Sequence, residues 1–343
     1  MKRCRVVTLS LTLLLSIAFS APAAAQIPPD LPPLEDIQDE LRDLLDAVNF
    51  TSITAGLINL GTTRDTRASS LKINRDPEDD NIFTSDKRKV NISRLYVNLF
   101  RPYGERGRQF RLGVYISSSK TEEPFELQRL LNYAGDIRTK SNNIGFDLGY
   151  RIPFGRNSKW SFEPGLGFGY SRFKSRHDYV GDLGEQIIKP IAEGIFFNWN
   201  SNVFSYRGMA TFHYELPFGD RMIFRYQGTY VHSYIDSIKV TDPVQRTNSH
   251  FDSIFNRVRL TGPTDWSLFG RDLGWRVTVS NTTFVGKNDD VLGFRWFNRY
   301  DADIVWNYTG DIRVLNEITF GFGVTHGADV EGFSFGFGIR LKI

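Results

Sequence analysis

Long runs of strictly alternating apolar and polar residues constrain this 343-residue chain more than any other feature. Between positions 160 and 171 the even positions hold only Trp, Phe, Pro, Leu or Tyr, whereas the odd positions hold only Ser, Glu or Gly. Successive side chains of a β-strand point to opposite faces, so such a run predicts a strand with one apolar and one polar face. The pattern recurs at 143–152 and 333–343, and less regularly at 110–117, 204–216, 222–234, 273–285, 292–308 and 312–324.

The length of these runs separates two all-β architectures. A soluble β-sandwich also buries one face of each strand, but strands of soluble proteins average about 5 or 6 residues. The runs here extend over about 9 to 15 residues, and about 9 to 11 are needed to cross a bilayer obliquely. We therefore predict an all-β fold, a transmembrane antiparallel up-and-down β-barrel with a polar interior. The aromatic residues expected at the membrane interfaces are Trp160, Tyr170, Trp296, Tyr300, Trp306 and Tyr308.

Residues 1–25 have the features of a secretory signal peptide. Lys2, Arg3 and Arg5 precede an apolar run at 6–19, and three alanines at 23–25 supply a small-residue cleavage pattern. The apolar run is shorter than the roughly 20 residues of a membrane-spanning helix. Of the 42 basic and 39 acidic residues of the chain, three basic ones belong to this leader, so the exported chain is electrically balanced. This balance gives no support to a nucleic-acid partner.

Two short segments separate the leader from the alternating region, which we take as a barrel domain of residues 50–343. Residues 26–33 contain four prolines, which predict an extended linker. In residues 34–49 the apolar positions from Leu34 to Val48 recur at helical spacing, which predicts one short amphipathic helix before the barrel. The other faces of this helix are acidic and carry Glu35, Asp36, Asp39, Glu40, Asp43 and Asp46.

The connections between the runs alternate between short and long. Short periplasmic turns and longer external loops are typical of an outer-membrane barrel. Counting from a first strand between residues 52 and 74 gives about twelve strands, and an even number places both termini in the periplasm. Residues 261–272 contain Gly262 and Pro263 and are expected to form an unusually long periplasmic turn. Other short turns are expected at 102–107, 155–158, 217–220 and 309–311, and long loops at 76–86, 120–140, 173–202 and 236–251.

Many charged residues occupy the same alternate positions, odd or even, as the polar residues of their strand, and we expect these charged residues to line the lumen. Arginine outnumbers acidic residues in this set, which leaves two interpretations: a paired network that stiffens the barrel, or a pore with anion preference. A lumen with excess arginine could also serve as a socket for the acidic helix. Glycines that point inward are expected to leave room along one wall, and they lie at 145, 149, 165, 167, 169, 321, 323, 336 and 338. The lumen-facing set is Arg111, Asp147, Arg151, Glu163, Arg207, Glu215, Arg225, Arg276, Arg295, Arg299, Asp301, Asp303, Arg313, Glu317, Arg340 and Lys342.

No group of residues in the sequence forms a coherent catalytic or metal-binding pattern. The single cysteine, Cys4, belongs to the leader, so thiolate metal sites are not expected. His232 and Ser233 suggest a membrane-embedded hydrolase, but neighbouring strand residues point to opposite faces and cannot form one dyad. We therefore expect a non-enzymatic protein without a cofactor. A surface-interaction protein, an adhesin or receptor, is the alternative, because the loop at 173–202 contains Ile195, Phe196, Phe197 and Trp199.

An N-terminal helix leading into a barrel of about twelve strands resembles the translocator of autotransporters, over residues 34–343. Since no passenger precedes the helix, the chain is similar to the solitary autotransporter-like barrels. The resemblance implies the outer membrane of a Gram-negative bacterium, with membrane lipid, lipopolysaccharide and the barrel-assembly machinery as partners. It implies a translocator-like protein or a narrow, porin-like pore. In that setting the helix at 34–48 either occupies or caps the lumen from the periplasmic side, or lies in the periplasm against a neighbour or the membrane.

Overall fold

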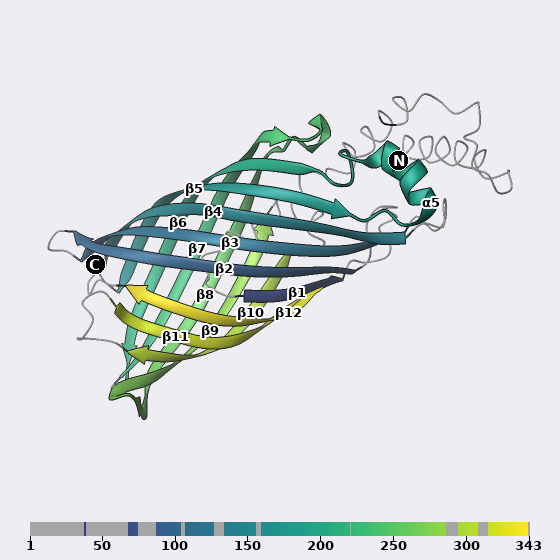
Figure 1. The fold of residues 1–343 in the computed structure, drawn as a ribbon. Helices are drawn as coiled ribbons and strands as arrows, with labels where there is room; N and C mark the ends of the chain where they lie inside the picture. The colour runs from purple at the N-terminus through teal and green to yellow at the C-terminus, as the bar shows by residue number, and fades with distance from the viewer. Residues whose placement is uncertain are drawn as a thin grey trace.

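The computed structural model describes residues 68–74, 87–103, 107–126, 134–155, 159–219, 221–285, 294–307 and 315–341, together with Gln38. Within these ranges twelve antiparallel strands follow one another around a closed barrel, and β1 pairs with β12 to close it (Figure 1). The predicted fold class is thereby confirmed. The strands are β1 (Ala68–Asn74), β2 (Lys87–Tyr103), β3 (Arg108–Glu126), β4 (Ala134–Phe154), β5 (Trp160–His177), β6 (Asn200–Phe218), β7 (Met222–Val240), β8 (Asn248–Leu268), β9 (Arg271–Val285), β10 (Trp296–Asn307), β11 (Leu315–Gly327) and β12 (Val330–Leu341).

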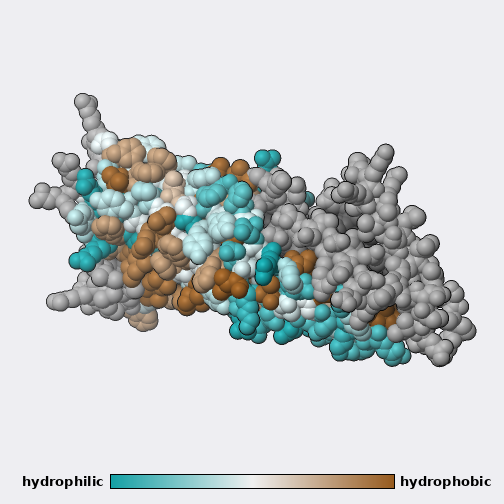
Figure 2. Space-filling model, turned by 90° about the horizontal axis from the view of Figure 1, so that it is seen from above, coloured by the Kyte–Doolittle hydropathy of each residue, from teal (hydrophilic) through white to brown (hydrophobic). Residues whose placement is uncertain are grey.

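The barrel is inverted relative to a soluble protein, because its apolar side chains are exposed and its polar ones are buried. Leu166 on the outer face is 58% exposed, whereas Glu163 and Asp147 on the inner face are 1% and 0% exposed. Hydrophobic residues gather over the wall toward the end that carries the C-terminus, and hydrophilic ones extend toward the other end (Figure 2). This distribution suits a wall whose outer face contacts lipid.

The two ends of the barrel differ in their connections, as predicted. Connections of two to five residues join β2 to β3, β4 to β5, β6 to β7 and β8 to β9, and we call this the inner end. Gly107 and Gly155 occupy two of these turns at φ values of 68° and 84°, a region that glycine adopts without steric cost. We call the opposite end of the barrel the outer end. The predicted turn at 309–311 lies outside the described residues.

Several predicted boundaries are wrong because the strands continue beyond the membrane-crossing runs. The expected loops at 120–140, 173–202 and 236–251 are shortened by strand extensions at both of their ends. The expected turn at 261–272 is also wrong. There β8 continues to Leu268, and a register shift between Pro263 and Ser267 accommodates the proline before a two-residue turn at Phe269 and Gly270. A bulge of this kind tolerates proline, which cannot donate to the strand ladder.

The connection between β5 and β6 contains a helical segment that the sequence did not predict. It consists of α5 (Gly181–Leu183), the π-helical turn η1 (Gly184–Ile188) and α6 (Lys189–Ala192). The amide of Gln245, in the short 3₁₀ turn η2 (Pro243–Gln245), donates to the backbone oxygens of Gly194 and Ile195 at 2.7 and 2.8 Å. The two external connections are thus joined to each other.

At the outer end an apolar cluster covers part of the inner face of the barrel, whereas the inward side chains of β3 and β4 there are polar. Side chains from β1, β2, β5 to β9 and β12, with two from connecting segments, pack into one buried cluster that we call the apolar layer. Phe173, Val203 and Ile235 are 0% exposed, so water does not reach these side chains. The apolar layer comprises Leu71, Ile73, Val90, Ile92, Phe173, Trp199, Val203, Ile235, Phe251, Phe284, Phe294 and Val330.

The segments predicted before the barrel lie almost wholly outside the described residues. This applies to the leader at 1–25, the linker at 26–33 and the helix at 34–49, apart from Gln38, which is helical. None of the helices in the described ranges is long and apolar enough to span a membrane.

Candidate functional site

Glu163 of β5 is the centre of a buried ion-pair group on the inner wall. Its two carboxylate oxygens accept hydrogen bonds from Arg111 Nε at 2.6 Å and from Arg151 Nη2 at 3.1 Å. His213 Nε2 of β6 lies 3.1 Å from the same carboxylate. A buried carboxylate is costly unless its charge is paired and its lone pairs are hydrogen-bonded. Two guanidinium groups and one imidazole meet that requirement here.

Asp147 of β4 forms a second buried pair one level nearer the outer end. It accepts hydrogen bonds from Arg207 Nη2 at 2.8 Å and from the Tyr96 hydroxyl at 3.2 Å. Arg207 also donates to the Tyr115 hydroxyl at 3.0 Å and stacks over its ring, with Cζ 4.9 Å from the ring centroid. Arg111 donates to Tyr96 at 2.8 Å, which joins the two groups into one network across β2 to β6.

Glycines that point into the lumen leave the space that the side chains of this network occupy. A Cβ at Gly149 would lie 2.7 Å from Glu163 Oε1, and one at Gly113 or Gly145 would overlap the ring of Tyr96 or Tyr115. The inward glycines are expected to leave room along one wall, and Gly336 and Gly338 do line a cavity in the lumen. At Gly113, Gly145 and Gly149, however, tyrosine and carboxylate side chains lie close against the backbone.

Below this network, toward the inner end, the lumen widens into a cavity of about 670 Å³ that we call the arginine cavity. Seven basic and four acidic side chains line it, so its walls carry an excess of positive charge. The basic residues are Arg111, Arg151, Lys159, Arg225, Arg257, Arg259 and Arg276, and the acidic ones are Glu163, Glu215, Asp303 and Glu317.

Arginines on neighbouring strands produce much of this charge. Arg225 of β7 lies directly opposite Arg259 of β8 in the strand register, and like charges so placed repel each other. Arg225 Nε donates to Glu215 at 2.7 Å, and Arg276 Nη2 of β9 donates to Glu317 at 2.8 Å. No carboxylate within the described part of the chain forms an ion pair with Arg259, so positive charge remains available on this wall.

The remaining residues of the predicted lumen-facing set lie in different places. Arg299 pairs with Asp301 of the same strand at 3.1 Å, whereas Arg295 is exposed just before β10. The Arg340 side chain, Arg313 and Lys342 lie outside the described residues, as do the six acidic residues of the predicted plug helix. Gln38 Nε2 donates to the backbone oxygen of Pro190 in α6 at 2.9 Å, at the outer end rather than at the predicted inner end. The carbonyls of the last helical turn lack partners within the helix, which explains this contact.

Sequence reasoning missed five side chains that complete the site. Tyr96, Tyr115, His213, Arg257 and Arg259 all lie on the inner face. Odd or even position contained the signal for four of them. Tyr115 has the parity of Arg111, and His213 has that of Arg207 and Glu215. Arg257 and Arg259 have that of the buried Phe251 and Ser253. The alternation of β8 is weak in the sequence because its outer face carries Asp252 and Asn256, polar residues in place of apolar ones.

The structure also shows where the residues lie that suggested a hydrolase or a surface-interaction protein. His232 is exposed on the outer face and Ser233 is buried on the inner face, as the alternation requires. On the inner face Ser161 lies opposite His213 in the register, but no hydrogen bond joins these two side chains. Of the four side chains that suggested a binding loop, Ile195, Phe197 and Trp199 are 3%, 2% and 4% exposed, and Phe196 is partly buried against the cluster that contains Phe197. They anchor the loop and are not displayed to a partner.

Comparison with known proteins agrees with this architecture. A model of the family described as "Solitary outer membrane autotransporter beta-barrel domain" matches residues 56–338. Among solved structures, the β domain of the Bordetella autotransporter BrkA is similar with a TM-score of 0.49 and 10% identity, over 80% of this chain and 96% of that one. The transport unit of autotransporter AIDA-I from Escherichia coli has a TM-score of 0.49 and 11% identity, over 81% and 88%. The translocator domain of NalP from Neisseria meningitidis has a TM-score of 0.46 and 8% identity, over 82% and 90%.

No curated protein sequence matches the chain. The family match nevertheless extends through almost all of the described barrel, from before β1 into β12. The chain therefore belongs to the solitary outer-membrane autotransporter β-barrel family.

Proposed function

We propose that this protein is a non-enzymatic outer-membrane barrel that acts as a narrow, anion-preferring pore of the translocator-like type. The observation that carries the proposal is the arginine cavity, whose lining has more basic than acidic side chains. Rings of arginine or lysine favour anions in pores because they stabilise negative charge within a confined, low-dielectric space. The proposed setting is the bacterial outer membrane, with its lipids and the barrel-assembly machinery as partners.

The apolar layer gives this pore a closed state. Side chains such as Phe173 and Phe251 pack together at the outer end of the lumen, while the arginine cavity lies near the inner end. A hydrophobic constriction blocks ions by excluding water, so conduction requires these side chains to separate. Replacing Phe251 with Ser should therefore increase the frequency of open events.

Single-channel recording across a planar bilayer with a KCl gradient tests the proposal. We expect the reversal potential to show preference for chloride over potassium, both in the native barrel and in the Phe251→Ser variant. The double variant Arg257→Gln/Arg259→Gln should weaken this preference, because it removes two positive charges from the cavity wall.

A matched control removes the same charge near the same end of the barrel but outside the cavity. Arg101→Gln/Arg221→Gln alters two exposed side chains, one on the outer face of β2 and one in the turn before β7. Its reversal potential should equal that of the native barrel. Cation preference in the native barrel, or equal effects of the two double variants, would contradict the proposal.

The six carboxylates of the acidic helix predicted at 34–48 complement the positive charge of the arginine cavity, which favours the lumen as the place of this helix. The contact of Gln38 with Pro190 points to the outer end of the barrel for at least this residue. Deleting residues 27–49 and recording conductance distinguishes these placements. An increase in conductance supports occupancy of the lumen, whereas unchanged conductance places the helix outside the pore.

A further inference from the structure

The apolar band on the outer face of β2 to β5 ends along a sharp line. The last apolar side chains are Leu95, Ile116 and Ile144, which are 52%, 55% and 51% exposed, followed by Tyr170 on β5. Two residues farther along each strand, toward the outer end, the outward position is polar: Ser93, Ser118, Asn142 and Arg172. This line is where the hydrocarbon region of a bilayer ends and its headgroup region begins.

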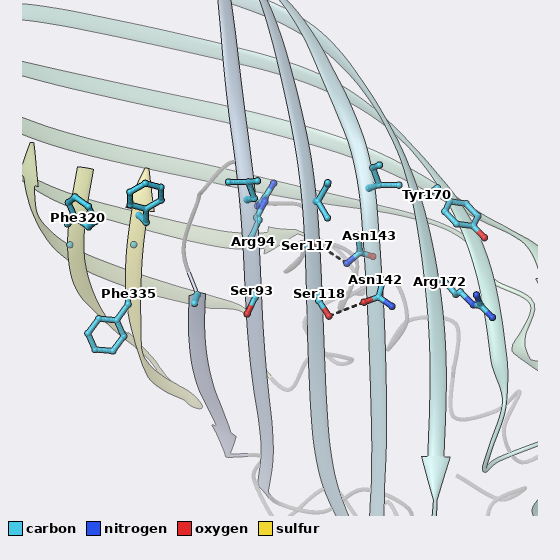
Figure 3. Close-up of a pocket in the computed structure, with 17 residues that line it drawn as sticks. Ser93, Arg94, Ser117, Ser118, Asn142, Asn143, Tyr170, Arg172, Phe320 and Phe335 are labelled. Carbon is cyan, nitrogen blue, oxygen red and sulfur yellow. Dashed lines mark hydrogen bonds between the residues drawn. The ribbon is translucent and has the colours of Figure 1, made fainter. Parts of the chain in front are cut away.

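A groove of about 970 Å³ lies on this line, where β1 begins (Figure 3). Its lining combines apolar side chains, such as Leu95 and Ile116, with the polar row at the end toward the exterior. Figure 3 shows Ser118 and Asn142 on adjacent strands, joined by a hydrogen bond of 3.0 Å, and Arg172 beyond them on β5. A membrane lipid likewise has an apolar acyl chain and a polar headgroup. Its two parts therefore match the apolar part of the groove and the polar row beside it.

Beyond the polar row the outer face carries a ladder of lysines. Lys120 lies opposite Lys140 in the register of β3 and β4, and Lys140 lies opposite Lys174 in the register of β4 and β5. Side chains opposite each other on antiparallel strands are about 5 Å apart at Cβ, so three lysines in a row repel one another. Lys120 is paired with Glu122 at 2.6 Å. In the described part of the chain no carboxylate forms an ion pair with Lys140, Lys174 or Arg172.

We propose that Lys140, Lys174 and Arg172 form a binding site for the phosphate groups of an outer-leaflet lipid. An anion between Lys140 and Lys174 would relieve their repulsion, and Arg172 presents a guanidinium fork suited to phosphate. These three residues lie at headgroup level, directly above the apolar part of the groove, so a phosphorylated headgroup and its acyl chain fit together. A free phosphate would satisfy the cations but would leave the apolar groove unfilled. The site rests on the proposed outer-membrane location and does not involve the arginine cavity.

Native mass spectrometry of the full-length protein in detergent tests this site. The probes are diphosphoryl lipid A, phosphatidylcholine and inorganic phosphate. We expect diphosphoryl lipid A to bind most tightly and the variant Lys140→Gln/Lys174→Gln to weaken its binding about 30-fold, since each cation near a charged headgroup contributes a factor of roughly 5. Both substitutions are at solvent-accessible positions, so the thermal midpoint should not change.

A matched control removes two positive charges at the same end of the barrel, away from β3 to β5. Lys239→Gln/Arg246→Gln alters exposed residues at the end of β7 and after η2, and should leave lipid A binding unchanged. Equal losses in the two double variants, or no loss in either, would overturn the assignment. Displacement of lipid A by equimolar inorganic phosphate would also overturn it, because the ligand would then be the free anion. Anion preference in bilayers should be the same in all of these variants, so failure of this site and failure of the pore proposal are distinguishable.

Discussion

At the scale of single residues, the buried carboxylates of the inner wall, Asp147 and Glu163, each accept hydrogen bonds from several partners. Asp147 illustrates this, since it is 0% exposed and accepts hydrogen bonds from Arg207 and Tyr96. Removing one member of a buried ion pair leaves the other charge uncompensated, and this costs more than the pair itself contributes. The network is therefore sensitive to changes that conserve side-chain volume but remove charge.

We expect Asp147→Asn to lower the free energy of unfolding in detergent by about 3 kcal/mol, because Arg207 loses its charged partner. Urea titration, followed by heat-modifiable gel mobility, measures this change. Asp178→Asn makes the same chemical change in an exposed pair with Arg138, where Asp178 is 79% exposed. That control should change stability by less than about 0.5 kcal/mol. Similar losses in both variants would show that the buried network has no special role.

At the scale of elements, β8 shows why some boundaries could not be predicted from the sequence. Gly262 and Pro263 are typical turn residues, yet the strand continues through them with a register shift and reaches its turn at Phe269 and Gly270. A bulge and a turn have the same local sequence signals, and only pairing with β9 distinguishes them. The strands with clear alternation, such as β5, were predictable because lipid outside and polar groups inside both impose a period of two.

The turn between β8 and β9 gives a prediction at this scale. Phe269 and Gly270 have φ values of 52° and 72°, which fit a two-residue hairpin turn with both residues left-handed. Gly270→Ala should destabilise the barrel by about 1 kcal/mol. Phe269→Asn should be neutral or stabilising, since asparagine tolerates this conformation and Phe269 is 85% exposed. Unfolding midpoints of the two variants measure the difference. An equal loss in both would rule out the assigned turn geometry.

At the scale of the whole molecule, residue parity predicts which face a side chain occupies but not which side chains meet. Arg276 pairs with Glu317, 41 positions away, and Arg207 pairs with Asp147, 60 positions away. Such contacts depend on the curvature and stagger of the closed sheet, which no local pattern contains. The apolar layer was missed for a related reason, because inward apolar residues near the outer ends of some strands look like irregular alternation in the sequence.

Site-directed spin labelling in lipid vesicles tests the layered lumen most directly. In a Cys4→Ser background, labels at Leu166, Val203 and Arg257 sample the outer face, the apolar layer and the arginine cavity, respectively. We predict high accessibility to oxygen at 166, high accessibility to a water-soluble nickel chelate at 257, and low accessibility to both reagents at 203. Nickel accessibility at 203 equal to that at 257 would mean an open aqueous channel from end to end, and would contradict the closed outer end.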